Sequence, residues 1–450
     1  MSTGENLALL TDLYQLTMAQ TYLQNRKTER ATFSLFIRAY PRHRGYFVSA
    51  GLYDVLDFLE NFSFDTGAID YLRSKRLFSD EFLDFLKGLR FTGEVWAMPE
   101  GRLFFKDEPI LEVTAPIIEA QIVETFIINQ INLQSLIATK AARCVYAARG
   151  RMVVDFSLRR TQGIDAGMKV ARASYLAGFS GTSNVRAGQR YGIPIVGTMA
   201  HSFISSFARE IDAFRAFATS FPDNSVLLID TYDTITAAQK VVSLAREMAA
   251  RGQRIQGIRI DSGDLVKLAK EVRNIFDAAG MKDIKIVGSG GLDEYDLADF
   301  SDAGAPYDSY GVGTKMGVSG DAPWFDIAYK LVEHAGRSVL KLSPGKISWP
   351  GEKQVFRQRD NQGQLRCDVI GLREDHFPGM EPLLKKVMEH GKVLPPRPTL
   401  DDSRTTLMQE IACLPDSVKA IRNPSSYPVE FTPGLRALLE RTEQEVNQAR

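Results

Sequence analysis

The stretch VLLIDTYDTITAAQKVVSLAREMAARGQRIQGIRID, residues 226–261, decides the fold class of this chain. It begins with an unbroken apolar run that ends in Asp230, continues with helical spacing over residues 234–250, and closes with a second apolar run that ends in Asp261. Near-continuous apolar strands joined by a helix are typical of a parallel βαβ unit, in which both faces of the sheet are buried. The stretch therefore predicts a parallel sheet covered by helices.

The same rhythm continues on both sides of this stretch. Further apolar runs alternate with helical segments, and these runs occupy residues 152–156, 177–181, 193–197, 284–288 and 307–313. Six or seven such units without a leading glycine fingerprint favour a closed barrel over an open doubly wound sheet. We expect an α/β protein in which residues 117–332 form a (β/α) barrel, which the family resemblance described below implies to be irregular.

The flanking segments have a mixed character. Residues 1–116 combine amphipathic helices with a β-rich unit at 91–116, and residues 333–450 hold short strands, several prolines and a charged final helix. A chain of 450 residues is too long for one core, but each flank is too small to stand alone. We expect the two flanks to pack together as one discontinuous α/β domain, with a boundary near Pro116.

The composition excludes several classes of protein. Basic and acidic residues number 55 each, so no nucleic-acid or anionic-lipid surface is indicated. The three cysteines are widely spaced, which argues against a disulfide framework or a structural zinc site. The sequence has no signal-peptide pattern and no apolar run of membrane-spanning length. We expect a soluble cytoplasmic protein.

Polar residues stand at the carboxyl ends of the predicted barrel strands, the edge where (β/α) barrels build their active sites. These strand ends are Asp155 to Arg159, His201, Asp230 to Asp233, Arg259 to Asp264, Ser289 to Gly291 and Gly313 to Lys315. A single aspartate at such a place is more often a helix N-cap, and a lone histidine is more often satisfied by the backbone. Six polar ends in register predict one shared cavity, in which His201 is a candidate acid, base or ligand.

Two glycine-rich turns predict an anion site. Residues 288–291 (GSGG) precede a helix, and residues 311–314 (GVGT) end the next strand. Backbone N–H groups at such turns cradle anions, and barrels often bind phosphate with their last loops. The chain has no GxxxxGK[ST] motif, so a nucleotide would not bind through a P-loop.

Other residues indicate the kind of ligand. Carboxylates suited to Mg²⁺ or ribose hydroxyls are Asp230, Asp233, Asp261 and Asp264. Guanidinium groups suited to an anionic substrate or leaving group are Arg38, Arg42, Arg159 and Arg160. Tyr14 and Phe156 could supply flat faces for an aromatic ring. Together these residues predict a site that binds a phosphorylated sugar next to an aromatic acid.

The chain resembles the nicotinate phosphoribosyltransferase family in motifs that follow the family's order. They are TDLYQLTM at 11–18, FSLRR at 156–160, GFSGTSN at 178–184, GTMAHS at 197–202, IRIDSGDL at 258–265 and YGVGTK at 310–315. The resemblance implies a homodimeric type II phosphoribosyltransferase of NAD salvage. It would join nicotinate to 5-phosphoribosyl 1-diphosphate, with ATP as co-substrate and Mg²⁺ as cofactor, and release nicotinate mononucleotide and diphosphate.

The resemblance also implies residue roles. His201 would be phosphorylated by ATP and act with Asp230 and Asp261. Nicotinate would contact Tyr14 (from the partner subunit), Phe156, Arg159, Ser183 and Thr198. The phosphoribosyl group would contact Arg259, Ser289, Gly290, Gly291, Gly313 and Thr314. Diphosphate would contact Arg38 and Arg160. The role of Arg42 stays open, because its loop departs from the family's glycine-rich form.

Two alternatives remain at this point. One is a nicotinamide phosphoribosyltransferase, although the related nicotinamide enzymes carry an aspartate where this chain has Ser183, and a serine does not repel a carboxylate. The other is a non-catalytic protein that binds a phosphoribosyl metabolite. The presence of His201, Asp230 and Asp261 argues against it.

Overall fold

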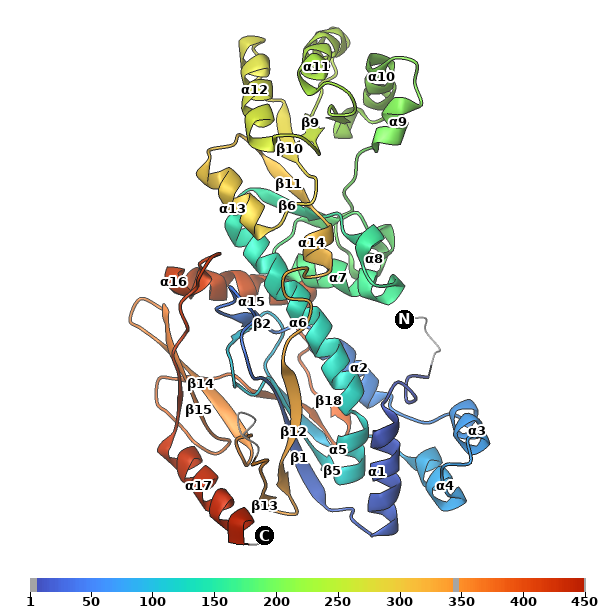
Figure 1. Ribbon diagram of the computed structural model, residues 1–450, viewed down its shortest axis with the longest axis vertical. Helices are drawn as coiled ribbons and strands as arrows, with labels where there is room; N and C mark the ends of the chain where they lie inside the picture. The colour runs from blue at the N-terminus through green and yellow to red at the C-terminus, as the bar shows by residue number, and fades with distance from the viewer. Residues whose placement is uncertain (1–5, 343–347, 449–450) are drawn as a thin grey trace. The chain divides into compact units, whose positions relative to one another are not determined.

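The computed structural model describes residues 6–342 and 348–448 and divides into two compact units (Figure 1). The first unit comprises the chain up to Leu136 and from Trp324 onward, and the second comprises Ile137–Pro323. The division falls inside helix α6 (Glu124–Ala147), so Pro116 lies within the first unit. No helix among the described residues is long and apolar enough to cross a bilayer.

A seven-stranded sheet combines both ends of the chain in the first unit. Strand β1 (Arg30–Ile37) lies between β5 (Leu111–Pro116) and β12 (Ile327–His334), antiparallel to both. The order β13-β12-β1-β5-β3-β17-β18 is completed by β3 (Glu94–Ala97), β13 (Arg337–Ser338), β17 (Lys385–Glu389) and β18 (Lys392–Val393). The expected domain built from N- and C-terminal segments is therefore confirmed.

Two smaller sheets and eight helices accompany this sheet in the described part of the first unit. The smaller sheets are β16 (Glu381–Pro382), β14 (Lys353–Arg359), β15 (Leu365–Leu372) and β19 (Val429–Phe431), and β2 (Phe47–Val48) with β4 (Leu103–Phe104). The helices are α1 (Leu13–Gln24), α2 (Leu52–Glu60), α3 (Thr66–Ser74), α4 (Asp80–Gly88), α5 (Ile117–Ile122), α15 (Leu400–Cys413), α16 (Asp416–Lys419) and α17 (Pro433–Gln448). The apolar sides of α1 to α5 join the seven-stranded sheet in one core, while Leu435 of α17 belongs to a second cluster around Phe47, Phe104 and Ile370.

The apolar spacing over residues 119–148 predicts a single long helix, and this prediction is wrong in one respect, because α5 ends at Ile122 and α6 begins at Glu124. Ile122, Phe126 and Ile127 are buried on both sides of the break, and the Phe126 ring stacks on Phe58. Because burial continues across the break, the apolar spacing contains no sign of it.

The second unit contains a parallel six-stranded sheet in the order β7-β6-β11-β10-β9-β8. Its strands are β6 (Met152–Asp155), β7 (Gly181–Thr182), β8 (Val226–Leu228), β9 (Gly257–Ile260), β10 (Lys285–Gly288) and β11 (Ser309–Val312). The parallel pairing confirms the α/β class. Among the described residues, hydrogen bonds do not join β8 to β7 in a closed ring.

Helices connect and cover these strands (Figure 1). They are α7 (Ile164–Leu176), α8 (Val185–Tyr191), α9 (His201–Ser205), α10 (Glu210–Ser220), α11 (Thr234–Ala249), α12 (Leu265–Ala278), α13 (Glu294–Asp302), α14 (Thr314–Gly317) and the 3₁₀ turns η1 (Leu158–Arg160) and η2 (Pro222–Asn224). The βαβ unit at 226–261 forms as expected from its apolar runs.

The run Ile193–Gly197, expected as a buried strand, is instead an extended and mostly exposed segment. It pairs with β7 through Thr182 alone, which accepts from Val196 N and donates from its own N to Pro194 O. Pro194 has no N–H to offer a ladder, and Ile195 is 59% exposed. His201 therefore follows a loop and begins the short helix α9. Residues 203–217, whose apolar spacing predicts one helix, are divided between α9 and α10.

Candidate active site

Strand β9 anchors the loop that leads to His201. The guanidinium of Arg259 donates from Nη1 to Thr198 Oγ1 at 2.7 Å and from Nη2 to the Met199 carbonyl at 2.8 Å. Burial lowers the pKa of Arg259, although the nearby carboxylates of Asp261 and Asp230 oppose that shift. The third guanidinium nitrogen, Nε, is buried without a hydrogen-bond partner in the described chain. Arg259 thus fixes the loop and keeps one donor unused.

The imidazole of His201 faces the loop that follows β8. Its Nδ1 lies 3.1 Å from Oγ1 of Thr231, and the ring is half-buried. This contact joins α9 to the segment directly after Asp230. The other ring nitrogen, Nε2, has no hydrogen-bond partner among the described residues. His201 is therefore oriented from one side and unengaged on the other.

The two strand-end aspartates that the sequence singled out lie together. Oδ2 of Asp230 accepts from the backbone N of Asp261 at 3.0 Å and from Ser262 Oγ at 2.6 Å. Asp261 in turn accepts from the hydroxyl of Ser289, at the start of the first glycine turn. Oδ1 of Asp230 is buried and unpartnered within the described residues, although native proteins leave few buried polar atoms without partners. Asp230 therefore presents one oxygen to whatever occupies this site.

The other two acidic candidates act as helix caps. Asp233 accepts from Thr236 N at the start of α11, and hydrogen bonding by the side chain and then the backbone of Thr236 lowers the pKa of Asp233. Asp264 accepts from Lys267 N at the start of α12. Both side chains are exposed. The described residues contain no group of three histidine, cysteine or acidic side chains placed to hold a metal ion. These aspartates therefore do not form a metal site from protein ligands alone.

The first glycine turn is packed directly against Asp261. Gly290 has φ +104°, and a Cβ there would lie 1.8 Å from the Asp261 carbonyl oxygen. Gly291 also has a positive φ, of +73°. Only glycine fits the first position without displacing the Asp261 backbone. The turn leads into α13, where Asp293 forms a capping box with Asp296.

The second glycine turn approaches Phe156. A Cβ on Gly311 would lie 2.4 Å from the Phe156 ring, and one on Gly313 would lie 3.0 Å from the Phe156 carbonyl. The side chain of Lys315, in α14 just after this turn, reaches back to Asp296 at 2.9 Å. Lys315 therefore joins the helix after the first candidate phosphate turn to the end of the second turn, where Thr314 is exposed.

Asp155 braces the end of β6 and is not free for a ligand. It accepts from Ser157 N, Ser157 Oγ and Thr182 Oγ1 at 2.5–2.8 Å, and burial raises its pKa. Ser183, which follows Thr182, donates its backbone N to the Asp155 carbonyl. Arg159 and Arg160 of η1 are exposed. Asp155 thus holds the Phe156 and Ser183 segments side by side.

Tyr14, Arg38 and Arg42 belong to the first unit. Tyr14, on α1, is 50% exposed, and partial burial raises its pKa. The Arg38 side chain pairs with Asp326, while its Nε is buried without a partner among the described residues. Arg42 is exposed in the loop after β1. The structure does not place these three relative to the site of the second unit.

Sequence reasoning missed a buried ion-pair cluster behind the first glycine turn. Lys140 and Arg143 of α6 pair with Glu294, the first residue of α13, and Lys140 also pairs with Asp321 at 2.7 Å. The first three side chains are fully buried. Charged residues inside an apolar helix were the available signal, since such residues are rarely buried without partners. Thr231, the partner of His201, had no signal of its own.

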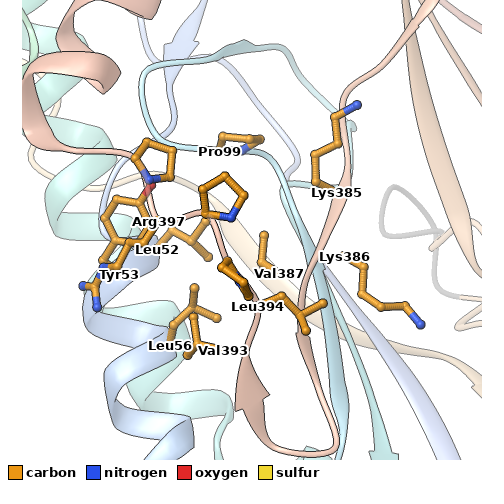
Figure 2. Close-up of a pocket in the computed structure, with 13 residues that line it drawn as sticks. Leu52, Tyr53, Leu56, Pro99, Lys385, Lys386, Val387, Val393, Leu394 and Arg397 are labelled. Carbon is orange, nitrogen blue, oxygen red and sulfur yellow. The ribbon is translucent and has the colours of Figure 1, made fainter.

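An apolar hollow lies in the first unit (Figure 2). It has a volume of about 220 Å³ and is lined mainly by Leu, Val and Pro side chains of α2, β18 and the segment that follows β18. Lys385 and Lys386 point away from its apolar centre in Figure 2, and Lys386 pairs with Glu94 and Glu389. It contains none of the candidate site residues.

Comparison with known proteins gives one consistent family. Models of the nicotinate phosphoribosyltransferase N-terminal domain, family and C-terminal domain match residues 9–132, 152–343 and 376–439. Nicotinate phosphoribosyltransferase pncB2 of Mycobacterium tuberculosis is 49% identical, over 94% of this chain and 91% of that protein. The Bacillus subtilis nicotinate phosphoribosyltransferase is 37% identical, over 95% and 93%. The crystal structure of human nicotinic acid phosphoribosyltransferase superimposes with a TM-score of 0.86 and 29% identity, over 96% and 99%.

Proposed function

Because this chain belongs to the nicotinate phosphoribosyltransferase family, we propose that it joins nicotinate to 5-phosphoribosyl 1-diphosphate in NAD biosynthesis. The products are nicotinate mononucleotide and diphosphate. The reaction is coupled to ATP hydrolysis through phosphorylation of His201, and it serves the salvage of nicotinate. The enzyme acts in the cytoplasm.

Two buried polar atoms that have no hydrogen-bond partner among the described residues support the proposal. Arg259 Nε and Asp230 Oδ1 lie on neighbouring strand ends, one a donor and the other an acceptor, and neither has a partner within the described chain. A ribose hydroxyl can accept from the first and donate to the second. The same strand end contacts Ser289 of the glycine turn through Asp261. A phosphoribosyl group therefore finds sugar contacts and a phosphate cradle in one unit.

The phosphate end is assigned to the two glycine turns. Backbone N–H groups of Gly290, Gly291, Gly313 and Thr314, together with the Ser289 hydroxyl, hold the 5′-phosphate. In the first turn the positive φ of Gly290 and Gly291 turns successive N–H groups toward one side, which makes an anion cradle, whereas Gly313 in the second turn has a negative φ. The Lys315–Asp296 ion pair keeps the two turns at a fixed separation.

Nicotinate binds beside the Phe156 ring, with Ser183 and Thr198 near its carboxylate and Arg159 as the cation. Tyr14 of the partner subunit covers the other face of the ring. The exposed apolar side chains that support a homodimer include Leu10, Leu13 and Tyr14 in the first unit and Ile164 and Val185 in the second, since monomers seldom expose such groups together.

The chemistry depends on charge at the anomeric carbon. The bond to diphosphate breaks through an oxocarbenium-like transition state, so Asp230 and Asp261 stabilise positive charge on the sugar while Arg38 and Arg160 stabilise the departing anion. Mg²⁺, held by the second carboxylate oxygen of Asp261 and by substrate oxygens, would neutralise diphosphate. One or two carboxylates plus phosphate oxygens is the arrangement that Mg²⁺ commonly adopts with phosphate substrates.

The direct test is product formation by the purified protein. With ATP, Mg²⁺ and 5-phosphoribosyl 1-diphosphate, nicotinate should be converted at least ten times more efficiently than nicotinamide. A preference for nicotinamide would establish the alternative substrate and remove the argument from Ser183. Binding of 5-phosphoribosyl 1-diphosphate without turnover of either pyridine would point to the non-catalytic alternative.

A further inference from the structure

We propose that Asp321 is a positioning residue, which uses the buried Lys140 to hold the second glycine turn at the separation from the first turn that a 5′-phosphate requires. Its Oδ1 accepts from Lys140 Nζ at 2.7 Å, and its Oδ2 accepts from the Tyr295 hydroxyl at 3.2 Å. Lys140 lies on α6, Tyr295 on α13 and Asp321 in the segment after α14. The inference rests on the proposed binding of phosphate by the two turns, and it adds what fixes their spacing.

The first turn is held through Glu294, the first residue of the helix that follows it. The Glu294 carboxylate lies 2.5 Å from Lys140 Nζ and 3.1 Å from Arg143 Nε. All three side chains are fully buried. Separating them would leave a buried charge without its partner, which is strongly destabilising. The start of α13, and the turn that leads into it, is therefore held to α6.

The second turn is joined to Asp321 by backbone hydrogen bonds. Val318 N donates to the Thr314 carbonyl at 3.2 Å, and Gly320 N donates to the Lys315 carbonyl at 2.9 Å. Asp321 directly follows Gly320 in the chain. Because these bonds close the segment from Thr314 to Gly320 on itself, a shift of the Asp321 backbone is passed to the end of the turn.

Lys140 therefore connects the segments that follow both turns. Its ammonium group contacts Glu294 on one side and Asp321 on the other. The Lys315–Asp296 pair also runs between these segments, but its side chains are 48% and 36% exposed, and exposed ion pairs contribute little to stability. We therefore assign the spacing of the turns mainly to the buried connection.

Charge and position predict opposite results when Asp321 is replaced. Asp321→Ala removes a negative charge close to the proposed phosphate turns, so by charge alone it would strengthen the binding of an anion. By position it releases the second turn from Lys140 and weakens that binding. Asp321→Asn removes the same charge but keeps an oxygen that accepts from Lys140. The Asp321 side chain is 29% exposed, so neither replacement leaves a large buried cavity.

The first test follows the two turns without any ligand, by hydrogen exchange of peptides that cover residues 288–297 and 311–320. Asp321→Ala should speed exchange in 311–320 about fivefold and leave 288–297 unchanged, because Glu294 keeps its contact with Lys140. Asp321→Asn should match the wild type in both peptides. The control is Asp302→Ala, which removes an exposed ion pair with Arg149 at the end of α13. Unchanged exchange in 311–320 for Asp321→Ala, or an equal increase in both peptides, would overturn the proposal.

The second test measures the Kd of 5-phosphoribosyl 1-diphosphate with Mg²⁺ by calorimetry, without nicotinate so that no turnover occurs. Asp321→Ala should raise the Kd about tenfold, while Asp321→Asn and Asp302→Ala should stay within about threefold of the wild type. In turnover assays of Asp321→Ala the KM for this substrate should rise about tenfold while kcat stays within about threefold, because saturating substrate compensates for weaker binding.

Two results of the binding test would contradict the role of Asp321. One is a Kd for Asp321→Ala equal to or below that of the wild type. The other is an equal loss of affinity in Asp321→Ala and Asp321→Asn, which would assign the effect to charge. A wild type that does not bind 5-phosphoribosyl 1-diphosphate would instead refute the proposed function, and the hydrogen-exchange result would still decide whether Asp321 holds the second turn.

Discussion

Replacement of Arg259 by methionine separates the anchoring of the His201 loop from substrate binding. The change keeps much of the side-chain volume but removes the bonds to Thr198 Oγ1 and the Met199 carbonyl. Hydrogen bonds from a charged donor contribute about 1.5–3 kcal/mol each, so the two together contribute about 3–6 kcal/mol. Relief of the buried charge offsets part of this, since burial already lowers the pKa of Arg259. The net contribution of Arg259 to holding the loop is therefore about 3 kcal/mol. If the variant loses this contribution in the transition state, the rate of phosphoenzyme formation falls about 100-fold.

The assay is phosphoenzyme formation with ATP alone, because no phosphoribosyl contact of Arg259 enters that step. Arg259→Met should lower the rate about 100-fold, and Thr198→Val, which removes one of the two bonds, about tenfold. Arg254→Met is the control, since Arg254 is 81% exposed and has only a 3.8 Å ion pair with Asp283. A wild-type rate for Arg259→Met would refute the view that this arginine positions His201.

Three further predictions concern other parts of the structure. Gly290→Ala would place a Cβ 1.8 Å from the Asp261 carbonyl and should raise the KM for 5-phosphoribosyl 1-diphosphate at least 30-fold. The control is Gly280→Ala, which has a positive φ but open space around it and should leave steady-state kinetics unchanged. Equal KM values for Gly290→Ala and wild type would contradict the phosphate-binding role of the turn. Ser183→Asp should move the ratio of nicotinate to nicotinamide turnover toward nicotinamide at least tenfold, and an unchanged ratio in competition assays would exclude Ser183 from substrate choice. Lys353→Met removes an ion-pair partner of the fully buried Glu112 and should lower the free energy of unfolding of the first unit by about 3 kcal/mol in urea titrations. Replacement of the exposed Lys392 by methionine is the control. A decrease below about 1 kcal/mol would mean that the ion pair with Arg373 alone is sufficient for Glu112.

The parallel sheet and the approach of its polar strand ends to one another were predictable from the sequence because the signals were local. The apolar runs that end in Asp230 and Asp261 are buried strands, and their terminal aspartates do lie together. The same apolarity misled at Ile193–Gly197, where Pro194 limits pairing and Ile195 faces outward. An apolar run favours burial, but it does not show that the segment pairs with a strand of its own sheet.

The division of the acidic residues could be only partly predicted. Asp233 and Asp264 have the sequence position of helix caps and act as caps. Hydrogen bonds from residues distant in the sequence, such as that from Ser289 to Asp261, decide which carboxylate oxygens are available to a ligand. The Thr231 contact with His201 joins two loops 30 residues apart, and neither periodicity nor composition contains information about it.

The central claim is that His201 is a nucleophile held from β9, and its most direct test is covalent labelling. Wild-type protein incubated with γ-labelled ATP and Mg²⁺ should retain about one acid-labile phosphoryl group per chain, mapped to the peptide that contains His201, and His201→Ala should retain none and lose the coupling of ATP hydrolysis to nicotinate mononucleotide formation. Label of the same amount on His201→Ala, or unchanged coupling in that variant, would contradict the account.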